Sequence, residues 1–225
     1  MHRFPQLSSK EKKLYTASLL LTLTAIVVTM ILIHTHFENS ESGSFCNISD
    51  YWNCDRVNKS TFAELFGVPV SIFGFLFYGT FAILQFLYLK TINIEKFLPP
   101  VFTTKRLAQL SLLAAIFSGG FLMYQEITYL GLLIPWGIIK NLIFMALPIW
   151  FYTKAQTVDK TETYYAVFLL ILALFGLNFA LYLTNIELFV LEAICIFCFS
   201  QQVLILIISI LLYLGFKKTI KQQNG

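Results

Sequence analysis

The chain has 225 residues, of which 57% are hydrophobic and only 12% are charged, and its mean hydropathy is +0.73. Soluble domains carry about a quarter charged residues, so this composition excludes an ordinary soluble protein and indicates a membrane protein. The net charge of +4 comes from basic residues spread over several separate segments, whereas a nucleic-acid interface needs a basic patch on one face. We therefore expect no nucleic-acid partner.

Six apolar segments reach or approach the ~20 residues that a helix needs to cross the hydrocarbon core. Helices are the expected form, because the open edge of a sheet leaves backbone groups unpaired in lipid. We therefore predict an all-α, polytopic helical bundle that forms a single membrane domain over residues 1–225. The predicted spans are residues 14–33, 68–89, 107–130, 133–152, 164–183 and 188–216.

The basic residues of the short connections predict the orientation of these spans. They lie in both termini and in the second and fourth connections, whereas the first connection is acidic on balance and the third and fifth have none. Both termini are therefore predicted to be cytoplasmic, in a membrane that we expect to be a prokaryotic inner membrane. The first span is too long for a typical signal peptide and has no small-residue cleavage site, so we expect a retained anchor.

All four cysteines are then predicted on the outer side, in two pairs. Cys46 and Cys54 lie in the extracytoplasmic loop 34–67, and Cys195 and Cys198 form a C-x-x-C motif at the start of the last helix. A helix N-terminus stabilises a thiolate, and the spacing of three places both sulfurs on one helix face. Because a thiolate attacks a disulfide within reach, this pattern predicts a redox relay between the two pairs.

Two other interpretations of the cysteines stay open. The loop pair can be a structural disulfide while Cys195 and Cys198 are small, inert, apolar side chains. Alternatively the cysteines bind zinc, with His34 and His36 as the nearest imidazoles. The loop cysteines are not closely spaced like zinc ligands, and the two histidines more simply mark the end of the first span, so we expect no metal site.

Two stretches of this sequence resemble the vitamin K epoxide reductase family. The stretch CNISDYWNCDRVNKSTFAELFGVPVSIFG, residues 46–74, is similar to the family's first external loop, in which two cysteines and a serine precede a glycine and a proline that lead into a helix. The stretch YLTNIELFVLEAICIFC, residues 182–198, is similar to the family's final hairpin with its active-site C-x-x-C. The resemblance covers roughly residues 40–90 and 164–216, and it implies a four-helix core with an extra hairpin at residues 107–152.

The resemblance also implies roles for the cysteines. Cys46 would exchange with a separate, extracytoplasmic thioredoxin-like protein, and Cys54 would form a transient disulfide with Cys195. Cys198 would face a membrane quinone, for which menaquinone, ubiquinone and a phylloquinone-like molecule are the candidates. The function implied is a quinone-dependent thiol–disulfide oxidoreductase that drives disulfide formation. Reduction of vitamin K or its epoxide, and a non-enzymatic transporter or assembly protein with a structural disulfide, remain as alternatives.

Two further residues are candidates for quinone binding. Ser60 matches the serine of the family's loop, although it is equally suited to cap a helix that begins at Thr61. Gln202 stands where family members often carry a tyrosine, and its amide can donate a hydrogen bond to a quinone oxygen.

Three charged residues near the outer ends of the spans have simpler expected roles. We expect Lys140 to extend its ammonium group along the helix to the outer interface. Glu187 and Glu192 flank the turn before the C-x-x-C and are expected to be solvated. The third and fourth spans are faintly similar to the last two, which would place Ile134 and Gly137 where the second hairpin has its cysteines.

Overall fold

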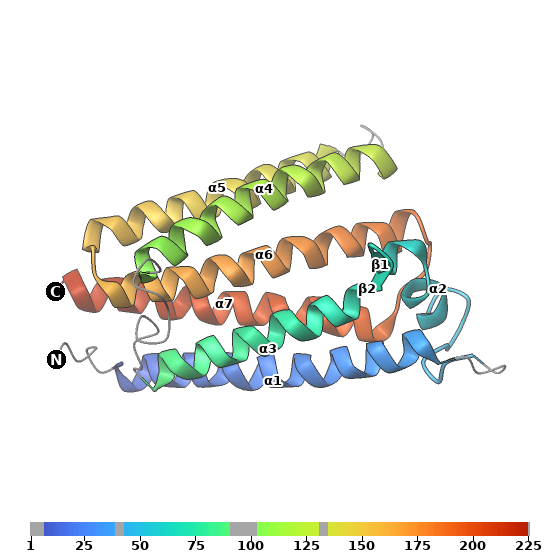
Figure 1. The fold of residues 1–225 in the computed structure, drawn as a ribbon, viewed down its shortest axis with the longest axis horizontal. Helices are drawn as coiled ribbons and strands as arrows, with labels where there is room; N and C mark the ends of the chain where they lie inside the picture. Colours follow the sequence, from blue (N-terminus) through green and yellow to red (C-terminus); the bar gives the residue numbers. More distant parts are fainter. Residues whose placement is uncertain (1–6, 39–42, 91–102, 131–134, 225) are drawn as a thin grey trace.

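The computed structural model describes residues 7–38, 43–90, 103–130 and 135–224, which form an elongated helical bundle (Figure 1). Six of its helices are long and apolar enough to cross a membrane, which confirms the predicted all-α, polytopic fold. They are α1 (Ser9–Phe37), α3 (Val70–Leu89), α4 (Thr104–Leu130), α5 (Pro135–Val158), α6 (Thr161–Phe189) and α7 (Ile196–Asn224).

Short elements fill the segment between α1 and α3 at one end of the bundle (Figure 1). Helix α2 (Cys54–Asn58) is followed by a 3-10 turn at Thr61–Ala63 and by a hairpin of β1 (Glu64–Leu65) and β2 (Val68–Pro69). The two strands are antiparallel, with Leu65 opposite Val68. Gly67 in the hairpin turn has a φ of 76°, which glycine adopts without steric cost.

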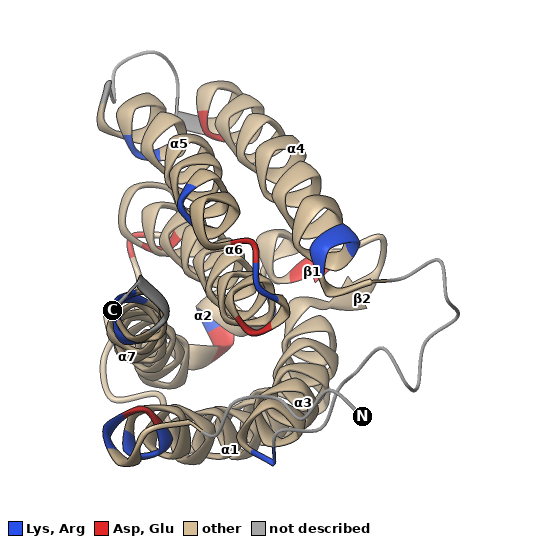
Figure 2. Cartoon of the chain, turned by 90° about the vertical axis from the view of Figure 1, so that its left-hand side faces the viewer, with Lys and Arg blue, Asp and Glu red and all other residues tan. Residues whose placement is uncertain are grey.

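Four helices form the core of the bundle, and α4 and α5 are attached to it. Helix α1 packs on α3 and α7, and α6 packs on α7 and also contacts α3. The α4–α5 hairpin packs mainly on the other side of α6, as the end-on view in Figure 2 shows. The arrangement is a four-helix core with an extra hairpin, as the resemblance implied.

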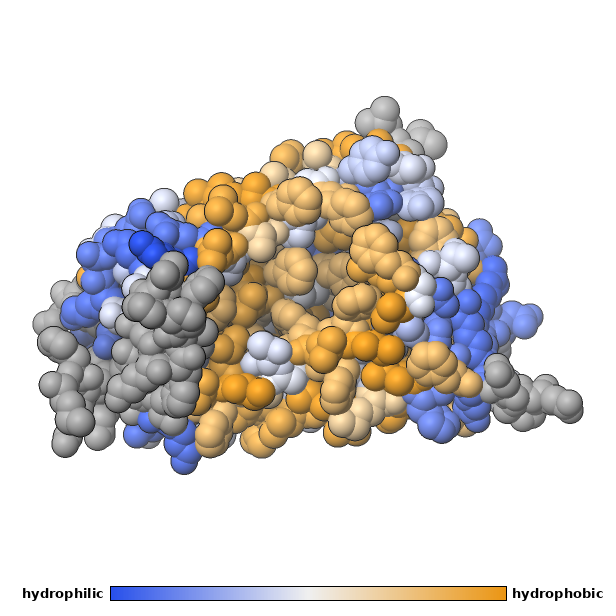
Figure 3. Space-filling model, in the orientation of Figure 1, coloured by the Kyte–Doolittle hydropathy of each residue, from blue (hydrophilic) through white to orange (hydrophobic). Residues whose placement is uncertain are grey.

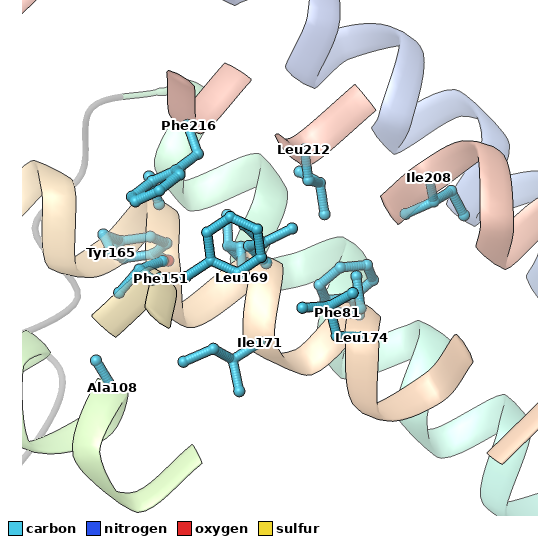
Figure 4. Close-up of a cluster of buried hydrophobic side chains, with 14 of the residues drawn as sticks. Phe81, Ala108, Phe151, Tyr165, Leu169, Ile171, Leu174, Ile208, Leu212 and Phe216 are labelled. Carbon is cyan, nitrogen blue, oxygen red and sulfur yellow. The ribbon is translucent and has the colours of Figure 1, made fainter. Parts of the chain in front are cut away.

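Helix α6 lies at the centre of this arrangement. Of the 18 residues in its most apolar stretch, 56% are buried, against 28–33% in the corresponding stretches of the other five long helices. Figure 4 shows side chains of α3, α4, α5 and α7 meeting those of α6, among them Phe81, Ala108, Phe151, Tyr165, Leu169, Ile171, Leu174, Ile208, Leu212 and Phe216. Helix α6 therefore joins the α4–α5 hairpin to the four-helix core.

The outer surface fits a bilayer. Figure 3 shows a broad hydrophobic band between two hydrophilic ends. Exposed side chains such as Leu20, Leu113 and Phe117 contribute to the apolar surface, which lipid tails can cover. Helix α1 begins and α7 ends at one end of the bundle, opposite the end that carries α2 and the β-hairpin (Figure 1).

The helices extend further than the apolar runs at several ends. Helix α6 continues to Phe189, and α7 begins only at Ile196, so the predicted span 188–216 includes a turn that is apolar enough to read as helix. The first residues of the predicted span 133–152, including Ile134, lie outside the described residues.

Candidate redox site

The two loop cysteines form a disulfide, with their Cα atoms 5.8 Å apart, and both are buried. Cys54 is the first residue of α2, a helix whose N-cap is Asn53. The Asn53 side-chain oxygen accepts a hydrogen bond of 2.9 Å from the backbone N–H of Arg56. Such a cap satisfies an orphan donor of the first turn, so it fixes where Cys54 sits.

Asp55 ties the two sides of the disulfide loop together. Its carboxylate accepts hydrogen bonds from the backbone N–H and hydroxyl of Ser44, at 2.8 and 2.6 Å, and from Asn47 Nδ2 at 2.6 Å. Lys59 Nζ lies 2.9 Å from the same carboxylate. Partial burial opposes ionisation of Asp55, but the bonds from Ser44, Lys59 and Asn47 hold its pKa well below its usual range.

Backbone pairing brings the loop to the C-x-x-C segment. The Ile194 N–H donates to the Tyr51 carbonyl at 2.7 Å, and the Asn53 N–H donates to the Ile194 carbonyl at 3.0 Å. This is a parallel bridge between Trp52 and Ile194. Because Asn53 precedes Cys54 and Ile194 precedes Cys195, the pairing places one cysteine of each pair at the same level.

The two pairs then share one apolar cluster. Its buried members are Leu32, Cys46, Cys54, Val57, Ala193 and Cys195, and the half-buried Cys198 packs against them. Cys195 and Cys198 are free thiols beside the loop disulfide. The arrangement therefore places a dithiol and a disulfide in one buried cluster, as thiol–disulfide exchange needs.

Cys195 holds the position before the first residue of α7, and its carbonyl accepts the Phe199 N–H at 2.9 Å. The Cys198 thiol donates to the Cys195 sulfur, and the N–H groups of Phe197 and Cys198 point to it. These donors outweigh burial, so the pKa of Cys195 lies below its ordinary value. Cys195 is thus the thiol of this pair that more readily forms the nucleophilic thiolate.

A cavity of about 400 Å³ opens beside Cys198. Helices α1, α3, α6 and α7 and the segment around the 3-10 turn form its walls, which are largely apolar. Five phenylalanines line it: Phe62, Phe73, Phe77, Phe175 and Phe179. The polar side chains along it are Thr29, Asn58, Ser60, Ser71, Tyr78, Glu187, Gln201 and Gln202.

The structure brings Ser60 and Gln202 together around this cavity, with Cys198. Ser60 holds the N-cap position of the 3-10 turn that begins at Thr61, as the alternative predicted, but its side chain makes no capping hydrogen bond; Ser60 Oγ donates instead to the Val57 carbonyl at 2.8 Å. Gln202 Nε2 donates to Glu187 Oε1 at 3.3 Å.

Asn58 is a cavity residue that the sequence analysis did not single out. Its amide Nδ2 donates to the Leu32 carbonyl at 2.8 Å and to Thr35 Oγ1 at 2.9 Å, which orients the side chain from α2 against α1. His36 Nδ1 lies 2.6 Å from the Asn58 carbonyl oxygen. An asparagine in a polar loop gives no sign that it folds back to membrane level, so only the packing of α2 identifies it.

The expectation of a solvated Glu187 is wrong. Its exposed fraction is only 4%, because α6 extends past the predicted end of the span and turns this side chain toward α7. Glu192, in the turn itself, is exposed as expected.

The expected interfacial position of Lys140 is also wrong. Its side chain is 5% exposed, and its Nζ lies 2.6 Å from Oε1 of Glu126, which is equally buried. Asn141 and Asn185 donate to the same carboxylate at 2.7 and 2.9 Å. A partner on α4 therefore holds the ammonium group inside the protein, where it has no need of the interface.

The histidines lie in the last turn of α1, as expected. Within the described ranges, no group of three or more His, Cys, Asp or Glu side chains is arranged to hold a metal ion.

Comparison with known protein families matches residues 16–153 to the Vitamin K epoxide reductase family. The matched region runs from α1 through the disulfide loop and α3 to the α4–α5 hairpin, and it ends before Cys195 and Cys198. Neither the curated proteins nor the solved structures contain a match. Since the match covers more than half of the sequence, the chain belongs to the vitamin K epoxide reductase family and is a membrane-embedded redox oxidoreductase.

Proposed function

We propose that this protein oxidises the dithiol of an extracytoplasmic thioredoxin-like partner and passes the electrons to a membrane quinone, so that it drives disulfide formation. The observation that carries the proposal is that the loop disulfide and Cys195 are buried in the same apolar cluster. A structural loop disulfide has no need of a free dithiol beside it. A relay requires the two pairs to lie near each other.

The electrons move in pairs, by thiol–disulfide exchange. The partner dithiol reduces the Cys46–Cys54 disulfide and becomes a disulfide itself. The Cys54 thiolate then attacks Cys195 of an oxidised Cys195–Cys198 pair, which releases the Cys198 thiolate. Attack of Cys46 on Cys54 restores the loop disulfide and leaves Cys195 and Cys198 reduced. The loop disulfide and free Cys195 and Cys198 fit the state that follows this exchange.

The cavity beside Cys198 suits a quinone ring. Ligand pockets are commonly about 300–1,000 Å³, mostly apolar, with a few polar groups that orient the ligand. Phenylalanine side chains can pack on the ring faces, and we assign Ser60 and Gln202 to its oxygens. A bound quinone accepts two electrons and two protons. Menaquinone, ubiquinone and a phylloquinone-like molecule share that chemistry.

The proposed orientation places the disulfide loop outside the cytoplasm. The loop's end of the bundle carries Asp55 and Glu64 beside Arg56 and Lys59, whereas lysines cluster where α1 begins and α7 ends, at the opposite end (Figure 1). Basic residues favour the cytoplasmic side, so both termini are assigned to it. A prokaryotic inner membrane, with disulfide formation on its outer face, agrees with this assignment.

The test is a trapping experiment on the Cys198→Ala variant in membranes. Without Cys198 the Cys195 thiolate attacks Cys54 and releases the Cys46 thiolate, and alkylation of Cys46 then prevents it from reversing the exchange. We expect non-reducing mass spectrometry of alkylated protein to find a Cys54–Cys195 disulfide, with Cys46 alkylated. The Cys195→Ala variant is the control and should retain Cys46–Cys54.

An intact Cys46–Cys54 disulfide with Cys195 free and unreactive in the Cys198→Ala variant would rule out the relay. A second measurement separates the alternative functions. The relay requires that Cys195→Ala and Cys198→Ala each abolish quinone reduction by partner dithiol. A non-enzymatic membrane protein would work without either thiol, and an epoxide-reducing enzyme would accept vitamin K epoxide in the same assay.

A further inference from the structure

We infer that Glu187 carries the proton of Cys195 to the quinone. This inference rests on the proposed function, and it assigns to the cavity an acid–base residue on α6. Oxidation of two thiols releases two protons, and reduction of a quinone to a quinol consumes two. The proposed step balances as follows: the Cys195 and Cys198 thiols become one disulfide, their two electrons pass to the quinone, and their two protons end on its oxygens.

The two thiols differ in how their protons can reach the cavity. Cys198 lines the cavity, so its proton can pass directly to a bound molecule. Cys195 is completely buried and does not line the cavity. Cys198 contacts both Cys195 and the cavity, but it has its own proton to release, so the proton of Cys195 needs a second acceptor that reaches the cavity.

Glu187 occupies that position. It lines the cavity with Cys198, and the backbone N–H of Cys195 faces its carboxyl group. The carbonyl of Glu187 accepts the Ala193 N–H at 3.1 Å, which fixes the turn between the carboxyl group and the thiol. Gln202, from the next turn of α7, contacts Glu187 Oε1 at 3.3 Å. The carboxyl group thus lies between the buried thiol and the space for the quinone.

The surroundings of Glu187 do not explain it as a structural residue. Within the described part of the chain it forms no ion pair, and its one side-chain hydrogen bond to another side chain is the long contact with Gln202. Burying an ionised carboxylate without a cation is costly, whereas the neutral acid is tolerated. A carboxyl group that can take up and release a proton here is therefore better suited to transfer than to anchoring.

The other polar groups of the cavity do not exchange protons readily near neutral pH. Glu187 is the single carboxyl among the described residues that line it. The titratable groups that face Glu187 are Cys195, just before α7, and Cys198 on α7, and Tyr78 on α3 lines the same cavity. A phenol has an ordinary pKa of about 10, and hydroxyl and amide side chains are weaker acids still. No charged side chain of α1 lines the cavity.

The first experiment compares Glu187→Gln with Glu192→Gln, its matched control in the exposed turn. Glutamine keeps the shape of the side chain and can still accept the Gln202 hydrogen bond, but it cannot carry the proton. We expect Glu187→Gln to reduce a short-chain naphthoquinone about 100-fold more slowly, in the range that general acid–base catalysis contributes. Single-turnover exchange between a dithiol and the loop disulfide, followed by alkylation without quinone, should stay within about threefold of the native protein.

Quinone reduction by Glu187→Gln within about threefold of the native rate would overturn the inference but leave the relay intact. Failure of the native protein to reduce any quinone would instead overturn the proposed function. Chemical rescue adds a readout that a structural role cannot produce. Formate should restore part of the activity of Glu187→Ala, because it replaces the missing proton carrier, and no rescue by formate would count against the inference.

The second experiment needs no turnover. Dicyclohexylcarbodiimide modifies protonated carboxyl groups in apolar surroundings, and peptide mapping of the full-length protein in detergent locates the adduct. We expect modification of Glu187, none of Glu192, and protection of Glu187 by the naphthoquinone. An unmodified Glu187, or modification that the naphthoquinone leaves unchanged, would contradict a proton-holding group that faces the quinone.

Discussion

The α4–α5 hairpin and the α6–α7 hairpin each bury a carboxylate, and the surroundings of the two carboxylates differ. Glu126 of α4 meets the ammonium group of Lys140 and the amides of Asn141 and Asn185. Glu187 of α6 meets no cation; it has the backbone N–H of Cys195 and a long contact with Gln202, and it borders a cavity. Asn185 and Glu187 lie two residues apart on α6, so both carboxylates sit near the same level of the bundle.

The difference indicates different purposes. A buried charge is tolerated when a cation and several donors compensate it, and such a cluster holds the elements that contribute to it. The Glu126 cluster draws on α4, α5 and α6, so it attaches the extra hairpin to the core. Glu187 lacks this compensation and lies beside the cysteines. In an apolar layer, a carboxylate with a cation and several hydrogen-bond donors is suited to a structural role, whereas one without them is suited to acid–base chemistry.

The largest expected effect breaks the compensated site. Glu126→Gln leaves Lys140 buried without its counter-ion, and removing one partner of a buried pair costs about 3–5 kcal/mol. We expect the free energy of unfolding in detergent to fall by that amount. The double variant Glu126→Gln/Lys140→Met should recover most of the loss, because no charge is then stranded. An equal loss of unfolding free energy in the single and double variants would show that the stranded charge of Lys140 is not the cause of the instability.

A steric change at the same site should cost less. A Cβ atom on Gly137 would come within 2.8 Å of Glu126 Oε2, so Gly137→Ala must displace the carboxylate. We expect a loss of about 1–3 kcal/mol, the usual cost of overpacking. Gly120→Ala on α4 is the matched control, because nothing lies within 4 Å of its added Cβ. A smaller loss at Gly137 than at Gly120 would contradict the close fit around Glu126.

How much of this could be predicted depends on which kind of signal each feature leaves. Hydropathy identified the six long helices of the described chain, and the beginning of the last apolar run placed Cys195 and Cys198 near the start of α7. The position of Lys140 was predicted wrongly, because its partner Glu126 lies on another helix and no local sequence pattern joins the two residues. The burial of Glu187 was not predicted, because apolar residues continue across the turn between α6 and α7 and composition therefore does not show where α6 ends.

A third prediction concerns the loop, where the carboxylate of Asp55 is compensated but partly exposed. Its folded pKa is lowered, so its contribution to stability is present above the unfolded value of about 4 and is lost as the pH falls below it. We expect Asp55→Asn to lower loop stability by about 1 kcal/mol at neutral pH, since exposure weakens such bonds. Hydrogen exchange at the Ser44 N–H should report it.

The loss should shrink as the pH falls below about 4, because the carboxyl group of the unfolded loop then takes up a proton while the native carboxylate stays ionised, and the asparagine variant is unaffected. A pH-independent difference between the two proteins would assign the effect to the shape of the side chain and not to its charge. Lys59→Met is the matched control. It removes the ion pair but keeps the hydrogen bonds from Ser44 and Asn47, so it should cost less than Asp55→Asn.

The smallest expected effect on stability is at Glu187, and it decides the comparison. Glu187→Gln strands no cation and keeps an oxygen for Gln202, so we expect the free energy of unfolding to change by less than about 0.5 kcal/mol. Measured beside Glu126→Gln, the same chemical change would then be severe on one hairpin and silent on the other. A loss at Glu187 comparable to that at Glu126 would make it an anchor of α6 on α7, and slow quinone reduction in that variant would then reflect a disturbed cavity.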